Sequence, residues 1–423
     1  MFIQFHRLKS YTNAVLPNRG QDGLSKRLRV GDAVRQRISS QCMKAALRDG
    51  NLPLFVTGPD GEVIDDTMRD LAASLGIGMA HRSRYVFPGV VYPVLVDAFG
   101  DEDLAATYTA AFSEIFGAED GGKKDKKPTD AKPYDKGFVD QPLVLGEVEA
   151  QAIIQAIRTF KDNGVAPEKM RELFEKRGAA RKVGETVEQA VANVGALKAH
   201  CGIDGALFGR MITGSVVGRV DSCMLVSHAL TVHPLVSVGD YFSVKDTLKR
   251  ELEFADDNGA SHTNSVELTS GLFYEHWVFD VRQAVKNFAG LDASQIARIA
   301  GWLVRAVYAL EPAAKRGSTA PFGNVPFYMI ELGRRSPRTL MDAFEKALPH
   351  ADSEAAVAAL LAYREASNRK AGKTTALTLD SEDVAALADE KDIPLVEALS
   401  KLVETQVASA VEALLPQKQK EAA

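Results

Sequence analysis

Hydrophobic and polar positions alternate at the start of the chain and change their period further on. In "FIQFHRL" (2–8) apolar and polar side chains alternate, which predicts a strand with one buried face. Residues 11–37 show no periodicity and predict a long basic loop. A helix is predicted from about Gln41 to Leu47, because Met43 and Leu47 lie four residues apart on one face.

Further along the chain, helical and strand-like patterns follow one another in blocks. Residues 64–117 and 142–200 have mostly helical patterns, and the segment 120–137 between them is of low complexity and is predicted to be disordered. Residues 205–279 form short strand-like runs broken by Gly, Asn and Asp, and Ala-rich helical stretches predominate after about 340. This order predicts an α+β fold whose core is interrupted by a helical subdomain.

The composition is that of a soluble protein of the cytoplasm. Of the 423 residues, 46% are hydrophobic and 25% are charged. No apolar run approaches the roughly 18 residues of a membrane span, and "MFIQFHRLKS" is too short and polar for a signal peptide. Cys42, Cys201 and Cys223 form no paired motif, so neither disulfides nor structural zinc are expected. We therefore expect a cytoplasmic protein with no membrane partner.

The charge of the chain is unevenly distributed. The net charge is −5, yet residues 1–50 hold ten Lys or Arg against three Asp, a net of +7, which leaves −12 for the other 373 residues. Such an uneven distribution of charge along the chain indicates a face that binds a polyanion. A solvated basic arm without a partner is the alternative.

The stretch "RQRISSQCMKAALRD" (35–49) concentrates polar groups where the predicted helix begins. Either Ser39 or Ser40 can act as its N-cap. Spacings of three and four residues put three further polar side chains on one helical face: Gln41, Lys44 and Arg48. Hydroxyls, an amide and cations at a helix N-terminus suit phosphate binding, and capping alone is the plainer alternative.

Five blocks of sequence along the chain are informative when they are taken together. They are "NRG" (18–20) with Lys26 and "RISSQCMKAALR" (37–48), "GIDGALFGRM" (202–211), "SHALTVH" (227–233), "ASHTNSVELTSGLFY" (260–274) and "AKRGSTAPFGN" (314–324). Together they resemble the signature of the CasC-type backbone subunit of Cascade, the type I-E CRISPR surveillance complex. The resemblance covers most of residues 1–345.

The resemblance implies a particular α+β architecture. Residues 1–55 and 205–345 would form a modified RNA-recognition-motif core, which is ferredoxin-like. Residues 56–204 would form a helical fingers insertion, and residues 232–266 a projecting β-hairpin, the thumb. Residues 346–423 would form a C-terminal helical segment, which the resemblance does not cover.

The resemblance also implies a function in antiviral defence. Copies of the subunit would stack head to tail along one guide CRISPR RNA, together with other Cascade subunits. Each thumb would displace one nucleotide, so that the intervening bases can pair with target DNA. No cofactor and no catalytic residue are implied.

The resemblance assigns RNA contacts to particular positions. Phe242 would be the apolar wedge of the thumb, with hairpin packing as its alternative, and Met211 would pack against RNA, with core filling as its alternative. The full set of expected RNA-binding residues is Arg19, Lys26, Arg37, Ser39, Ser40, Gln41, Lys44, Arg48, Arg210, Met211, Tyr241, Phe242 and His262.

A metal site made of histidines and aspartates is not supported. The residues that could compose one are His228, His233, His262, Asp221 and Asp240. The spacing of five between His228 and His233 does not align two ligands on a helix, and no H-E-x-x-H motif occurs. We expect no metal.

Two rival functions remain at this stage. Asp32 lies in a loop ahead of a serine-rich helix, as does the aspartate with which related effector complexes cleave target RNA. Its structural alternative is an ion pair with Arg29 or Arg35. The second rival is a general single-stranded nucleic-acid-binding protein without a dedicated guide.

Overall fold

The computed structural model describes most of the chain. The described residues are 1–17, 19–49, 55–57, 63–65, 67–116, 139, 142–176, 178–196, 201–211, 218–244 and 262–415. The segment 120–137 and the tip of the predicted thumb lie outside them. The chain divides into two compact units: a first unit of Met1–Ile64, Leu225–Phe279 and Ala300–Gln406, and a second of Asp65–Met224, Asp280–Ile299 and Val407–Ala423.

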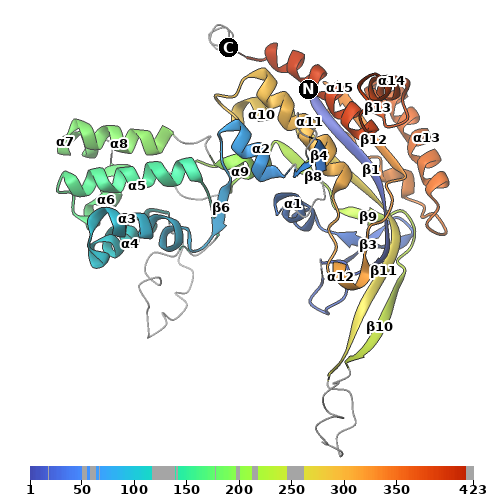
Figure 1. Cartoon of the computed structure of the whole chain (residues 1–423), viewed down its shortest axis with the longest axis horizontal. Coiled ribbons are helices and arrows are strands. Elements are labelled where there is room, and N and C mark those ends of the chain that lie inside the picture. The colour runs from blue at the N-terminus through green and yellow to red at the C-terminus, as the bar shows by residue number, and fades with distance from the viewer. Residues whose placement is uncertain are drawn as a thin grey trace, which may run out of the picture. The chain divides into compact units, whose positions relative to one another are not determined.

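The first unit is an α+β structure built on an antiparallel sheet, in agreement with the predicted fold class (Figure 1). The strands run in the order β13-β12-β1-β11-β9-β3-β2, and β10 and β8 also pair with β11. Their bounds are β1 Phe2–Ala14, β2 Arg27–Val30, β3 Ala33–Ile38, β8 Met224–Val226, β9 Ala229–Thr231, β10 Ser237–Val244, β11 His262–Asp280, β12 Phe327–Gly333 and β13 Thr375–Thr378. A separate pair joins β4 (Phe55–Thr57) and β5 (Val63–Asp65).

Helices accompany this sheet. They are α1 Ser40–Arg48, α12 Arg316–Thr319, the 3₁₀ helix η4 Met341–Phe344, α13 Ser353–Ala371, α14 Glu382–Lys391 and α15 Leu395–Glu412. Two helices of the described chain contribute residues to both units, namely α11 (Ala293–Ala309) and α15. The Ala-rich helices expected after 340 are thus present, with β13 among them.

The predicted opening strand is confirmed, but both of its faces are buried, Gln4 and His6 included, and the long basic loop is not confirmed. β1 continues to Ala14, and β2 and β3 form an antiparallel pair inside the segment expected to be a loop. Arg35 shows the cause, because a charged residue without apolar periodicity around it is fully buried here, and its guanidinium donates to the carbonyls of Thr231 (3.1 Å) and Phe344 (2.7 Å).

Three of the ten N-terminal cations are in fact part of the core. Besides Arg35, Arg7 pairs with Glu275 at 2.7 Å, and Lys9 pairs with Glu311 at 2.5 Å, all four side chains being buried. The charge of residues 1–50 therefore overstates the cationic surface. Residues 1–50 are also not a solvated arm, because β1 lies inside the sheet.

The predicted cationic helix is confirmed as α1. Ser39 is its N-cap, and the Ser39 Oγ accepts a hydrogen bond from the Cys42 N–H at 3.3 Å. Met43 and Leu47 are buried, so the opposite face of α1 is directed outward.

A buried polar network joins the sheet to α13. His6 Nδ1 lies 2.7 Å from the Tyr274 hydroxyl, and His6 Nε2 lies 3.3 Å from Glu331, which is also paired with Arg364 of α13. The His276 ring stacks on His6 with centroids 4.8 Å apart. Burial, and then the charge of His6, lower the pKa of His276 to about 3, and burial also lowers the pKa of His6.

Because of these histidines, the free energy of unfolding should fall as the pH is lowered. Below pH 6.5 His276 is protonated in the unfolded chain but stays neutral in the native chain. Its contribution to the free energy of unfolding is therefore complete above pH 6.5 and declines as the pH falls toward 3. The expected cost is about 1.4 kcal/mol per pH unit for this histidine. In H276F the difference in unfolding free energy between pH 7.5 and pH 5, from urea titrations, should shrink by about 2 kcal/mol. An unchanged difference would contradict this assignment.

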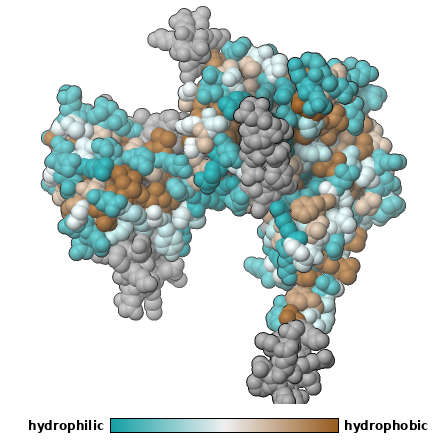
Figure 2. Space-filling model, viewed as in Figure 1, coloured by the Kyte–Doolittle hydropathy of each residue, from teal (hydrophilic) through white to brown (hydrophobic). Residues whose placement is uncertain are grey.

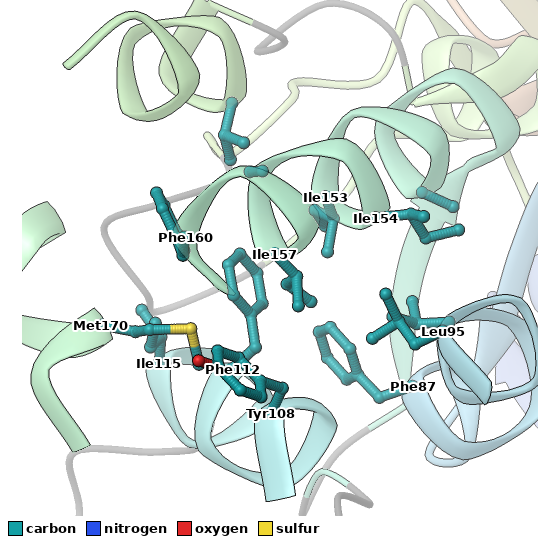
Figure 3. Close-up of a cluster of buried hydrophobic side chains, with 14 of the residues drawn as sticks. Phe87, Leu95, Tyr108, Phe112, Ile115, Ile153, Ile154, Ile157, Phe160 and Met170 are labelled. Carbon is teal, nitrogen blue, oxygen red and sulfur yellow. The ribbon is translucent and has the colours of Figure 1, made fainter. Parts of the chain in front are cut away.

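The second unit is mainly helical, as predicted for 64–117 and 142–200. Its elements are α2 Met68–Leu75, β6 Ala80–Ser83, the π-helix η1 Phe87–Val91, α3 Tyr92–Phe99, α4 Glu102–Phe116, β7 Leu143–Gly146, α5 Glu147–Asp162, the 3₁₀ helix η3 Pro167–Lys169, α6 Met170–Glu175, α7 Ala179–Val183, α8 Glu185–Ala196, α9 Gly202–Phe208 and α10 Val281–Asn287. Phe87, Phe112, Ile157 and Phe160 meet in its hydrophobic core (Figure 3). In the described part of the chain, no helix combines the length and apolarity needed to cross a membrane.

Candidate nucleic-acid interface

Polar residues expected to bind RNA surround one hollow in the first unit. This basic hollow has a volume of about 570 Å³ and lies at the N-terminus of α1. Four expected residues line it, namely Lys26, Arg37, Ser39 and Gln41. Pro17, Cys42 and His228 complete the lining.

The fold brings these residues together through the β2–β3 pair and α1. The Arg37 N–H donates to the Lys26 carbonyl at 2.8 Å, which fixes the two cations on neighbouring strand ends. β3 also pairs with β9, with Arg37 opposite Leu230, and this pairing places His228 just before β9 beside the start of α1. The sequence therefore encodes the hollow in three separate segments.

The cations of the hollow keep hydrogen-bonding capacity for a ligand. The Arg37 Nε is buried and has no hydrogen-bond partner among the described residues. Arg37 and Lys26 both lower the pKa of His228, although burial has the larger effect. Burial raises the pKa of the Cys42 thiol, so Cys42 lines the hollow as a neutral thiol.

The other expected residues near α1 have different positions. Ser40 donates its backbone N–H to His228 Nδ1 at 3.1 Å. Arg19 turns back on its own loop, where its guanidinium donates to the Gly23 carbonyl at 2.6 Å. Lys44 and Arg48 are partly buried on α1 and do not line the hollow.

Arg210 is placed differently from our expectation. It belongs to the second unit, its side chain is buried, and it pairs with Glu149 at 2.6 Å while also donating to the Val144 and Gly218 carbonyls. A guanidinium so enclosed has no face to offer RNA, so this assignment needs correction. The adjacent Met211 is 87% exposed, which suits a contact with a ligand better than core filling.

The predicted thumb corresponds to the hairpin of β10 and β11. The two strands are antiparallel from Ser237↔Thr269 to Val244↔His262, and they extend beyond the other strands of the sheet (Figure 1). Tyr241 is 70% exposed, and its neighbour Phe242 is half-buried on the other face of the hairpin.

Phe242 has two polar ring neighbours. The Lys315 Nζ lies 5.1 Å from the centroid of its ring, and the His262 ring lies 6.4 Å away. Further apolar side chains of β10 are exposed on the Phe242 face, namely Val238 and Val244. The hairpin therefore has an apolar strip, part of which is visible in Figure 2. Sequence reasoning missed Lys315, although it lies in the quoted block 314–324.

Asp32 has a structural environment. Its carboxylate accepts the Ala347 N–H at 2.9 Å and lies 3.7 Å from the buried Arg35, while its own N–H donates to the Glu345 carbonyl. The expected ion pair with Arg35 is thus present. These contacts tie the β2–β3 turn to the segment after η4.

No group of three or more potential metal-ligating side chains is found within the described ranges. His233, one of the residues considered, instead faces the Pro234 carbonyl at 2.8 Å and accepts the Leu272 N–H at 3.1 Å. Its two ring nitrogens are both occupied by the first unit's own backbone.

Comparison with known proteins identifies the family of the chain and solved structures with a similar fold. The family model described as "CT1975-like protein" matches residues 3–405, nearly the whole chain. A search of curated proteins found no match.

Two solved structures are similar over their full length and over nearly all of this chain. One is a chain of a "CRISPR RNA-guided surveillance complex, pre-nicking", with a TM-score of 0.69 and 20% identity, covering 97% of this chain and 100% of that chain. The other, from a "CRISPR RNA-guided surveillance complex", has a TM-score of 0.58, 19% identity and the same coverage. At this level of identity the likeness shows a common fold.

Proposed function

The chain belongs to the CT1975-like protein family, and we propose that it is a guide-RNA-binding backbone subunit of a type I-E Cascade surveillance complex. The observation that carries this proposal is the basic hollow, where two cations, a hydroxyl and an amide converge at the N-terminus of α1. Phosphates bind readily where helix amides and cations converge. The similar chains in RNA-guided surveillance complexes support the same function.

The hairpin supports a filament of copies along one RNA. Its exposed Tyr241 and half-buried Phe242 can stack on unpaired bases, which tolerates any sequence. Copies arranged head to tail would hold the guide backbone in their hollows and leave most bases free to pair with target DNA. Other Cascade subunits would complete the complex, which acts in antiviral defence.

The proposed subunit is not catalytic. Asp32, the residue on which a cleaving subunit would depend, accepts the Ala347 N–H and pairs with Arg35, so its carboxylate serves to hold the loop. This supports a binding function.

Removing the cations of the basic hollow should weaken RNA binding in a salt-dependent way. In K26A/R37A we expect the slope of log affinity against log salt to fall by about 1.4, since each lost phosphate contact on a single strand accounts for about 0.7. Filter binding of a guide-length RNA across a salt series measures it.

K370A/K373A is the matched control, because it removes two exposed cations of the first unit that do not line the hollow. Its slope should equal that of the wild type. Equal slopes for wild type and K26A/R37A would refute the phosphate-binding role of the hollow.

RNA that co-purifies with the protein separates the two binding functions. A dedicated guide gives one defined length derived from a repeat, whereas a general single-strand binder gives a broad range of lengths.

A further inference from the structure

His228 is held in one tautomer by the first turn of α1. The Ser40 N–H, one of the amides without a partner inside the helix, donates to His228 Nδ1 at 3.1 Å. An Nδ1 that accepts a hydrogen bond requires a neutral ring with its proton on Nε2. Burial together with Arg37 and Lys26 keeps the pKa of His228 below its ordinary value, which preserves this neutral form.

The His228 Nε2–H is left available for a ligand. His228 lines the basic hollow, and Nε2 has no partner among the described residues. Gln41 lines the same hollow, and its Oε1 lies 3.4 Å from the Ser40 hydroxyl. The hollow therefore contains two kinds of group: the cations Lys26 and Arg37, and a neutral pair formed by a fixed donor and an amide that both donates and accepts.

These two kinds of group match different parts of a nucleotide. The cations suit phosphate oxygens. A neutral donor beside a donor–acceptor amide suits a hydroxyl group, which accepts one hydrogen bond and donates another. Inside a nucleic-acid strand the 3′ and 5′ oxygens are esterified, so the 2′-hydroxyl of ribose is the only free hydroxyl of the sugar, and DNA lacks it.

We propose that His228 and Gln41 form a ribose-recognition pair that makes the hollow select RNA over DNA. The His228 Nε2–H donates to the 2′ oxygen, and the 2′-hydroxyl donates to Gln41 Oε1. This inference rests on the proposed function, because it assumes that a nucleic-acid strand occupies the hollow. It adds His228, which we did not include among the expected RNA-binding residues, as a specificity-determining residue.

The test compares an all-ribose oligonucleotide with the same sequence made of 2′-deoxy sugars, on the full chain. The wild type should bind the ribose strand more tightly, by roughly three- to tenfold per hollow, the range of one or two hydrogen bonds. In H228N the Asn Oδ1 can still accept the Ser40 N–H while the Nε2–H is lost. Its ribose preference should fall toward unity, with affinity for the deoxy strand unchanged.

The other outcomes are decisive as well. An unchanged ribose preference in H228N would show that His228 only caps α1, and an equal loss for both strands would show a phosphate contact; either result overturns the proposal. If the thermal midpoint shows that H228N is unfolded, Q41A decides, because Gln41 is exposed and its loss should reduce the preference in the same way. Should wild type bind neither strand, the proposed function itself fails.

Discussion

Replacing Arg7 by methionine should reduce the free energy of unfolding by about 3–5 kcal/mol, since it leaves the Glu275 carboxylate buried and unpaired. Arg7 is fully buried, and its guanidinium forms two bonds to Glu275, of 2.8 and 2.9 Å. It also donates to the carbonyls of Val307, Tyr308 and Leu310 at the end of α11. Urea titration of R7M beside wild type measures the loss.

Two further variants isolate the cause. R7M/E275L removes both charges and should recover part of the lost stability, because an apolar pair can replace a buried ion pair, whereas the carbonyls of Val307, Tyr308 and Leu310 stay without their donor. R29M removes an exposed arginine of β2 and should stay within about 0.5 kcal/mol of wild type. A loss below about 1 kcal/mol in R7M would mean that the buried pair is not the main tie between β1, β11 and α11.

Replacing Phe242 by alanine should abolish filament assembly while sparing the isolated subunit. A lost base stack is worth about 1–3 kcal/mol, and the loss recurs in each copy along one RNA. In the subunit alone the ring gives up mainly its contact with Lys315, worth about 0.5–1 kcal/mol at an exposed site. F242W keeps a stacking face and should assemble better than F242L.

The measurements are RNA-dependent assembly and the protease resistance of the free subunit. F322A is the control, because Phe322 is an aromatic residue of the first unit that is 62% exposed and lies outside the hairpin. Its assembly should match wild type. If F242A destabilises the free subunit as much as it weakens assembly, Phe242 is a packing residue.

The sequence predicted those parts of the fold in which hydrophobicity follows the backbone period. β1 and α1 were predicted from apolar positions at spacings of two and four, and the helices of the second unit from longer repeats. β2 and β3 were missed because residues 11–37 show no periodicity of apolar positions. Burial of Arg35 depends on carbonyls of Thr231 and Phe344, about 200 and 300 residues away, which no local pattern reveals.

The candidate site was predictable where its residues are neighbours in sequence. Ser39 and Gln41 follow from the cap of α1, and Lys26 and Arg37 from the family resemblance. His228 could be placed only by the pairing of β9 with β3. Arg210 shows the opposite error. It was expected to bind RNA beside Met211, but its guanidinium forms an ion pair with the buried Glu149.

The continuity of β11 has a mechanical consequence. Its 19 residues run from exposed His262 to the buried stretch that contains Glu275, so one strand serves both the hairpin and the core. A hinge would be easiest at Gly271, but His233 fills the space beside it, 3.0 Å from where a Cβ would stand, and accepts the Leu272 N–H. The hairpin therefore continues into the core as one uninterrupted strand. Because Phe242 pairs with Asn264 near one end of β11 and Glu275 of the same strand pairs with Arg7, we expect a force on the hairpin to reach the core through this ion pair.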